Sequence, residues 1–231
     1  GLLPEGSVQL LCGSARGVLD HLGGQDSVAF TGSADTAATL RSHPNVVGEG
    51  LHFTAEADSL NASILASDVA QNDPEFDLFI KGVFTEMTSK AGQKCTAIRR
   101  VLVPQTSVEP VIEALKAKLE KVVVGDPADE GVTMGALASI DQRDEVLKSI
   151  RGLTKSATVV FGDPDAVDSR PGAFMAPVLL KAGDKTASEP HEIEAFGPVS
   201  TVIGYDSTAD LFELVARGKG SLVASLVTKD S

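Results

Sequence analysis

The apolar positions of the chain form short strand-like runs that alternate with longer helix-like stretches, the pattern of an α/β protein. A strand that is buried on both faces is a continuous apolar run, and here most such runs are followed closely by Gly, Ser or Pro. On this basis we predict strands at residues 8–12, 27–31, 51–55, 100–103, 157–161, 177–180, 200–203 and 222–227.

Apolar residues that recur at spacings of three and four predict the helices. The clearest helix covers residues 74–91, where five apolar side chains share one face and Gly92 ends the pattern: Phe76, Phe79, Ile80, Val83 and Met87. Other predicted helices cover residues 14–22, 35–43, 107–122 and 141–150.

The alternation is interrupted by a polar stretch from Asp58 to Pro74. We therefore predict a domain boundary just after Glu56. Residues 1–57 would form part of a Rossmann-like cofactor domain with a parallel sheet, and residues 58–231 a second α/β domain. Both ends of the chain lie close to a predicted strand, so we expect this chain to be part of a longer protein.

Composition and charge narrow the class of protein. The net charge of −12 argues against nucleic-acid binding, because phosphate contacts need clustered Lys and Arg. The chain has no apolar run of membrane-spanning length and no signal-peptide pattern, so we expect a soluble, cytoplasmic protein. Two cysteines do not make a disulfide framework, and the four histidines have no metal-ligand spacing, so we expect no metal site.

Cys95 is the candidate nucleophile, in the connection between the long helix and a strand. Neighbouring positive charge favours the reactive thiolate, and the basic cluster Lys94, Arg99 and Arg100 flanks this cysteine. The competing interpretation is that Cys95 is a small buried hydrophobe, which is how we interpret Cys12 in its apolar run.

Three further motifs could bind or activate a ligand. Glu56 ends an apolar strand, where partial desolvation would raise its pKa toward that of a general base; the alternative is a solvated carboxylate. Gly32 and Ser33 form a strand-to-helix turn that could bind phosphate, or an ordinary βα turn. Glu194 and Phe196 precede a Gly-Pro turn; they could bind a ribose and a nicotinamide ring, or simply begin the next strand.

Taken in order, these motifs resemble those of the aldehyde dehydrogenase superfamily. The matching elements are Phe30-Thr-Gly-Ser33, Glu56 at a strand end, Gly92-Gln-Lys-Cys95, Val124-Gly-Asp-Pro127 and Glu194-Ala-Phe-Gly-Pro-Val199. The resemblance implies an aldehyde dehydrogenase fold, with part of the cofactor domain followed by the cysteine-bearing catalytic domain.

The resemblance also implies a role for each site residue. Cys95 would form a thiohemiacetal and then a thioester, its backbone N–H would contribute to the oxyanion site, and Glu56 would activate the hydrolytic water. Gly32 and Ser33 would bind the cofactor pyrophosphate. Glu194 and Phe196 would hold the nicotinamide ribose and ring. The implied cofactor is NADP or NAD, and the implied full-length protein is a homo-oligomer.

The chain departs from the common family pattern after the proposed base, where Glu56-Ala-Asp-Ser-Leu-Asn61 replaces Glu-Leu-Gly-Gly-Lys, and at Ala37, where a second glycine is common. This variant is similar to the branch that oxidises CoA-linked semialdehydes in aromatic degradation with NADP. Two rival enzymes also use a cysteine: a cysteine hydrolase, which needs a histidine base, and a CoA-acylating aldehyde dehydrogenase, which needs no Glu56. A non-catalytic binding module that retains the fold is the third alternative.

Overall fold

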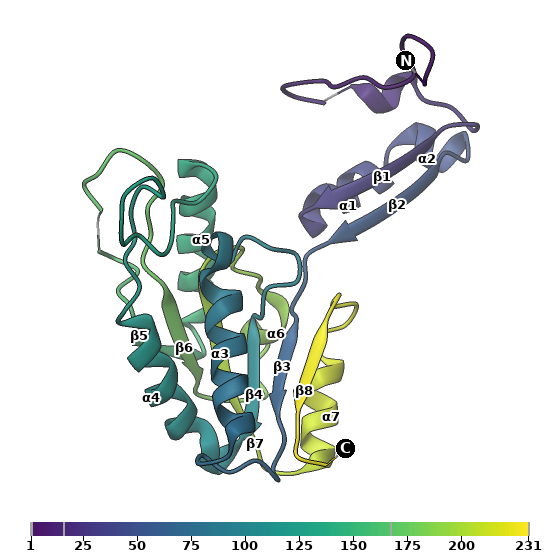
Figure 1. Cartoon of the computed structure of the whole chain (residues 1–231). Coiled ribbons are helices and arrows are strands. Elements are labelled where there is room, and N and C mark those ends of the chain that lie inside the picture. Colours follow the sequence, from purple (N-terminus) through teal and green to yellow (C-terminus); the bar gives the residue numbers. More distant parts are fainter. Residues whose placement is uncertain (1, 16, 167, 231) are drawn as a thin grey trace. The chain divides into compact units, whose positions relative to one another are not determined.

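The computed structural model describes residues 2–15, 17–166 and 168–230. Their contacts divide the chain into two compact units, Gly1–Asp58 and Ser59–Ser231 (Figure 1). Each unit is described by itself. The division falls next to the polar stretch that suggested a boundary, whereas the assignment of the units to cofactor and catalytic domains stays a prediction.

The first unit is built around two parallel strands, β1 (Ser27–Gly32) and β2 (His52–Ala57), which pair from Ser27 opposite His52 to Gly32 opposite Ala57. Two helices connect them, α1 (Ala34–Arg41) and α2 (Pro44–Gly48). A short 3-10 helix, η1 (Val18–His21), precedes β1. Ser33 caps α1 because its hydroxyl accepts a hydrogen bond from the Thr36 N–H. The strand–helix–strand connection predicted for this region is confirmed.

The prediction of a buried strand at residues 8–12 is wrong. The segment forms no strand, and Val8, Leu10 and Leu11 are exposed, as is Cys12. An apolar run becomes a strand only when a neighbouring strand pairs with it, and in the described residues β1 and β2 pair with each other alone. The helix predicted at 14–22 is reduced to η1, and Arg16 lies outside the described residues.

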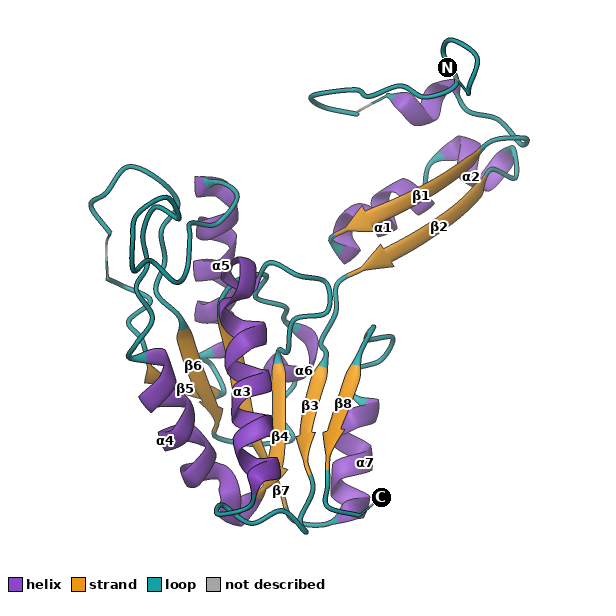
Figure 2. Ribbon diagram, in the orientation of Figure 1, coloured by secondary structure: helices purple, strands orange, loops and turns teal. Residues whose placement is uncertain are grey.

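The second unit contains a six-stranded sheet in the order β5-β6-β7-β4-β3-β8 (Figure 2). All neighbouring pairs are parallel except β5 and β6. The strands are β3 (Ala62–Leu65), β4 (Arg100–Pro104), β5 (Ala157–Phe161), β6 (Val178–Ala182), β7 (Val199–Tyr205) and β8 (Ala224–Val227). The aldehyde dehydrogenase fold expected from the motifs requires such an α/β sheet.

Helices cover both faces of this sheet. Val101 and Val103 of β4 pack against α3 (Pro74–Thr88) and α4 (Val108–Leu119), whereas Leu102 packs on the other face with Leu214 of α7 (Thr208–Ala216). Val178 and Leu180 of β6 contact α5 (Ile140–Leu153). Burial on both faces explains why these strands are continuous apolar runs.

Three elements of the second unit were not predicted: β3, α7 and the short helix α6 (Glu189–Glu192). β3 has the sequence Ala-Ser-Ile-Leu and lies within a polar stretch. Its two small residues, Ala62 and Ser63, leave only two large apolar residues, too few to predict a strand. All four of its residues are nevertheless buried, because β4 and β8 pair with it on either side.

β3, β4 and β7 bring their preceding loops together. They are adjacent and parallel, with Ala62 opposite Arg100 and Arg100 opposite Thr201. Because parallel strands begin at the same edge of a sheet, the residues just before each strand meet there. Cys95 precedes β4, and Glu194 and Phe196 precede β7.

Candidate active site

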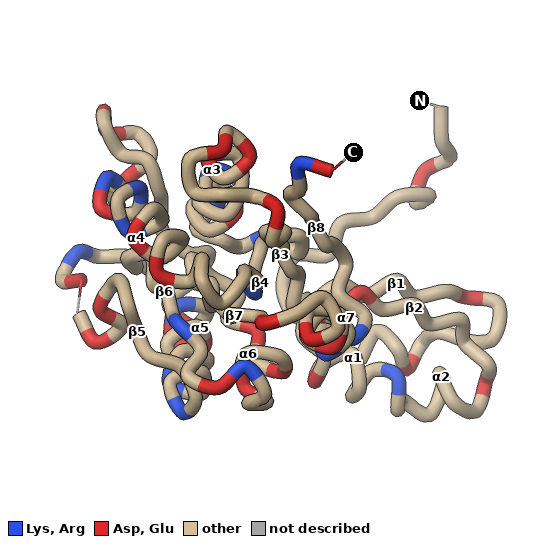
Figure 3. Tube along the Cα trace, turned by 90° about the horizontal axis from the view of Figure 1, so that it is seen from below, with Lys and Arg blue, Asp and Glu red and all other residues tan. Residues whose placement is uncertain are grey.

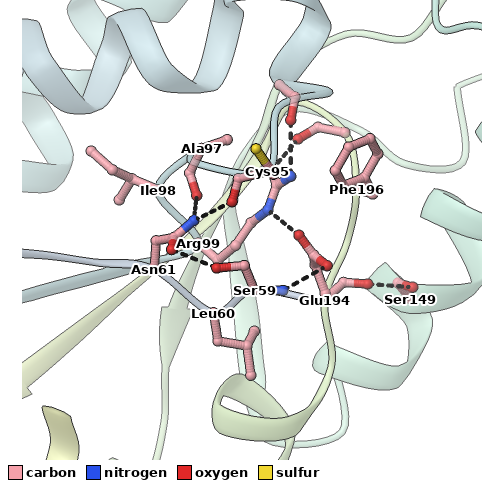
Figure 4. Close-up of polar contacts among 12 residues, drawn as sticks. Ser59, Leu60, Asn61, Cys95, Ala97, Ile98, Arg99, Ser149, Glu194 and Phe196 are labelled. Carbon is pink, nitrogen blue, oxygen red and sulfur yellow. Dashed lines mark hydrogen bonds and ion pairs between the residues drawn. The ribbon is translucent and has the colours of Figure 1, made fainter. Parts of the chain in front are cut away.

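The candidate active site of the second unit is formed by the three loops that lead into β3, β4 and β7 (Figure 4). We call the residues 92–98 before β4 the nucleophile loop and the residues 194–198 before β7 the Glu194 turn. Residues 59–61 supply the third side. Sequence positions more than 130 residues apart therefore share hydrogen bonds, such as that between Ser59 and Glu194.

Cys95 lies on the nucleophile loop and is exposed. Gly92 begins the loop with φ at +68°, and a Cβ at this position would overlap the Gly197 carbonyl. The Gln93 side chain secures the loop by accepting a hydrogen bond from the Ala138 N–H at 2.9 Å. The Cys95 N–H donates no hydrogen bond to any residue that the structure describes, which is consistent with the oxyanion role implied for it.

Asn61 holds the other end of the nucleophile loop. It is fully buried at the start of β3, and its Nδ2 donates to the carbonyl oxygens of Cys95 at 2.8 Å and Ala97 at 2.9 Å. Its Oδ1 accepts from the Val223 N–H at 2.9 Å and from the Ser59 hydroxyl. Nothing in the sequence pattern singled out Asn61, although a polar residue directly before a buried strand is a candidate for such a role.

Arg99 connects the nucleophile loop to the Glu194 turn. Its Nη2 donates to the Gly92 carbonyl at 2.9 Å and its Nη1 to the Gly197 carbonyl at 2.8 Å. Its Nε donates to Glu194 Oε1 at 3.2 Å, and its guanidinium lies 5.4 Å from the centre of the Phe196 ring. Burial lowers the pKa of Arg99, and the neighbouring carboxylate of Glu194 opposes that shift.

The Glu194 turn is held on both sides. Glu194 accepts a hydrogen bond from the Ser59 N–H at 3.1 Å in addition to that from Arg99. Two residues of α5 fix the backbone: Ser149 donates to the Glu194 carbonyl and Gln142 to the Phe196 carbonyl. The structure thus brings Cys95, Glu194 and Phe196 to one edge of the sheet.

The basic residues around Cys95 do not act as a free positive cluster. Lys94 Nζ forms an ion pair with Glu86 at 2.7 Å, and Arg99 pairs with Glu194. Arg100 turns into the core, where it donates to the carbonyls of Leu60 and Leu214, and burial lowers its pKa to about 10. The expectation that Lys94 activates the thiol is therefore not supported by this geometry.

The remaining predicted residues belong to the first unit. Gly32 ends β1 and Ser33 caps α1, so this turn lies at a helix N-terminus, a place where backbone N–H groups can bind an anion. Asp35 in the first turn adds a negative charge there. Glu56 lies on β2 opposite Thr31 and is exposed, so the expected partial desolvation is not observed. The two units are not placed relative to one another, so no distance joins Glu56 to Cys95.

With the geometry established, comparison with known proteins identifies the family. The family model described as "Aldehyde dehydrogenase family" matches residues 2–231. The chain belongs to the aldehyde dehydrogenase family. Among curated relatives, it is 44% identical to 3,4-dehydroadipyl-CoA semialdehyde dehydrogenase of Aromatoleum evansii, over 100% of this chain and 46% of that protein. It is 28% identical to alpha-ketoglutaric semialdehyde dehydrogenase of Bacillus subtilis, over 99% of this chain and 46% of that protein.

Solved structures agree with this family assignment. The structure of a mutant of an aldehyde dehydrogenase from Bacillus cereus matches with a TM-score of 0.76 and 29% identity, over 89% of this chain and 40% of that chain. A point mutant of betaine aldehyde dehydrogenase from Staphylococcus aureus, in complex with NAD+, matches with a TM-score of 0.78 and 25% identity, over 89% and 41%. The chain thus spans about half the length of the curated relatives it matches.

Four structural observations bear on other classes of protein and site. In the described part of the chain, no helix is both long and apolar enough to cross a membrane, and no group of three His, Cys, Asp or Glu side chains could hold a metal ion. Lysines and arginines of the second unit lie interspersed with acidic residues along its trace (Figure 3). The buried His191 is hydrogen-bonded to Arg100 and to the Lys185 carbonyl, and does not serve as a base for Cys95.

Proposed function

We propose that the full-length protein oxidises an aldehyde to the carboxylic acid with NADP or NAD, and that Cys95 is the nucleophile. The thiolate of Cys95 adds to the aldehyde carbon to form a thiohemiacetal. Loss of a hydride from that carbon leaves a thioester, and water then releases the acid and the free thiol. In sum, the aldehyde, one water and the oxidised cofactor yield the acid, a proton and the reduced cofactor.

The observation that carries this proposal is the exposed Cys95 on a loop fastened to the Glu194 turn. The nucleophile is accessible, its backbone is fixed through Asn61, and its N–H is available to a substrate oxygen. A fixed donor beside a nucleophile stabilises the negative charge that develops on the carbonyl oxygen.

Four residues are proposed to hold the cofactor, which accepts the hydride when bound. The turn at Gly32 and Ser33 precedes a helix N-terminus, which suits a pyrophosphate, although Asp35 weakens the attraction. Glu194 would accept hydrogen bonds from ribose hydroxyls, and the half-buried Phe196 would pack against the nicotinamide ring.

Glu56 is proposed as the general base that takes a proton from the hydrolytic water. Its carboxylate is exposed, and a bound substrate and cofactor would exclude water around it, which favours uptake of a proton.

The substrate is proposed to be a CoA-linked semialdehyde and the preferred cofactor NADP. The support is the 44% identity over the whole chain to an enzyme named for such a substrate, together with the Phe53-Thr-Ala-Glu-Ala and Gln93-Lys-Cys-Thr-Ala-Ile motifs. By analogy with the family, the full-length protein is proposed to be a homo-oligomer.

The decisive experiment measures reduction of NADP and NAD by the full-length protein with a CoA-linked semialdehyde and with a simple aldehyde. Cys95→Ser is expected to reduce turnover at least about a thousandfold, because the hydroxyl is a far weaker nucleophile than a thiolate. Cys12→Ser is the matched control and should retain full activity. Undiminished turnover in Cys95→Ser would overturn the proposal.

Glu56→Gln separates the rivals. A hydrolytic enzyme should stop at the thioester in this variant, so that one equivalent of reduced cofactor forms in a burst and turnover then falls. A CoA-acylating enzyme would be unaffected by Glu56→Gln and would instead require free CoA. A cysteine hydrolase would release an acid without reducing the cofactor. A non-catalytic module would do none of these.

A further inference from the structure

We propose that Arg99 is a positioning residue that couples the nucleophile loop to the Glu194 turn, so that the cysteine and the cofactor-binding carboxylate are set as one unit. This inference rests on the proposed function, because it gives a purpose to the Glu194 turn as a cofactor site. The hydrogen bonds of the Arg99 side chain go to Gly92, Gly197 and Glu194, and not to the Cys95 thiol.

The first support is that Arg99 hydrogen-bonds to two backbone segments, at Gly92 and Gly197, that already contact each other. The Gly92 backbone lies so close to the Gly197 carbonyl that a Cβ on Gly92 would be 2.1 Å from the carbonyl oxygen. Arg99 then donates one hydrogen bond to the carbonyl of each glycine, at 2.9 and 2.8 Å. A planar guanidinium can reach two carbonyls in different directions, which a lysine ammonium cannot do with the same geometry.

The second support is the buried ion pair between Arg99 and Glu194, which orients the Glu194 carboxylate. The Arg99 and Glu194 side chains are 4% and 8% exposed, so each is an ion buried in the protein. The Arg99 Nε and the Ser59 N–H each donate to one oxygen of the Glu194 carboxylate and so fix its direction. A carboxylate with one orientation can accept hydrogen bonds from a ribose without first being ordered, which is an advantage in affinity.

The third support comes from energetics. A buried ion pair is a weak source of stability, because desolvation offsets the attraction between the charges, and apolar residues of similar size often stabilise a protein as well. The arrangement of three hydrogen bonds and the contact with the Phe196 ring is specific in direction, which is what a positioning role requires.

The test uses the full-length protein with Arg99→Lys and Arg99→Gln, and Arg151→Gln on the exposed face of α5 as the control. Arg99→Lys retains the buried positive charge and is therefore the variant expected to fold. Its ammonium group cannot donate to both glycine carbonyls with the geometry of the guanidinium. Backbone amide exchange is followed for residues 92–96 and 194–197, the dissociation constant of NADP is determined by titration, and kcat and KM are measured where turnover occurs.

If Arg99 couples the loops, amide exchange in both segments should accelerate together in each variant, by at least about tenfold in Arg99→Gln, with a matching weakening of NADP binding. kcat should fall while KM for the aldehyde stays within about twofold. Arg151→Gln should change none of these quantities.

Two results would overturn the inference. One is a folded Arg99→Gln or Arg99→Lys protein in which exchange of both segments and NADP affinity equal those of the natural protein. The other is a loss of global stability alone, with the two segments unchanged in the folded fraction. Coupled loosening of both segments in a protein that oxidises no aldehyde would support the positioning role and refute the proposed function, so the two failures are distinguishable.

Discussion

Gly92 and Gly197 contact each other directly, although they are more than a hundred positions apart in the chain. Gly92 has φ at +68°, and its missing Cβ is the space that the Gly197 carbonyl occupies. Both glycines were noticed as parts of motifs that resemble a family. The structure supplies the physical reason: Gly92 leaves room for the Gly197 carbonyl, and Gly197 leaves room for the side chains of Val146 and Leu137.

At the residue scale, Gly92→Ala is expected to destabilise the protein by at least about 3 kcal/mol, since it adds a clash with a backbone carbonyl to the cost of a positive φ. Gly131→Ala is the matched control. Gly131 has φ at +85° but open space around the added carbon, so only the conformational cost of about 1–2 kcal/mol applies.

Urea unfolding of the two variants and the natural protein gives the comparison. The difference between the variants isolates the contact with Gly197 from the backbone strain. Equal destabilisation by both substitutions would contradict the close contact between the nucleophile loop and the Glu194 turn.

At the scale of elements, β3 organises the site. Asn61 stands at its amino end and hydrogen-bonds the nucleophile loop on one side and Val223, just before β8, on the other. Its own carbonyl also accepts from the amides of Arg99 and Arg100 at 3.1 and 3.0 Å. One residue thus aligns the entry of three neighbouring strands.

Asn61→Ala is expected to lower the free energy of unfolding by about 2–4 kcal/mol, because the carbonyls of Cys95 and Ala97, the Val223 N–H and the Ser59 hydroxyl all lose their Asn61 partner. It should also accelerate alkylation of Cys95 by iodoacetamide, since the loop loses its anchor. Asn72→Ala, at an exposed position, is the control and should change neither quantity. Unchanged alkylation in a destabilised Asn61→Ala protein would show that Asn61 supports the sheet but not the loop.

At the scale of the whole molecule, the two units differ in how many apolar side chains they bury. All three apolar clusters lie in the second unit, whereas the buried apolar residues described in the first unit are Leu19, Ala37 and Leu51. A two-stranded parallel sheet with so small a core is not stable by itself, since parallel sheets need cover on both faces.

Residues 59–231 produced alone are therefore expected to fold and to unfold in one cooperative transition in urea, close to the main transition of the 231-residue chain. Residues 1–58 alone are expected to be largely unstructured by circular dichroism. A non-cooperative transition for 59–231, or native-like strand content in isolated 1–58, would contradict this division of stability.

The sequence by itself determined the class of fold and most elements of the second unit. The apolar spacing of α3 and α4 and the apolar runs of β4 and β7 were sufficient to predict these elements, because their buried positions follow the period of a helix or a strand. The sequence also identified Cys95, Glu194 and Phe196 as candidates, since their motifs resemble those of a family to which the chain proved to belong.

Only the tertiary structure decided what local pattern cannot encode. Residues 8–12 look like a strand but have no partner, whereas β3 looks polar but is buried between two neighbours. The sequence marked Arg99 only as one of the basic residues near Cys95, and it did not mark Asn61 as a site residue. The contacts of both depend on carbonyls brought near by the parallel alignment of β3, β4 and β7. Hydrogen bonds between distant segments arise from strand order, and strand order is a property of the folded chain.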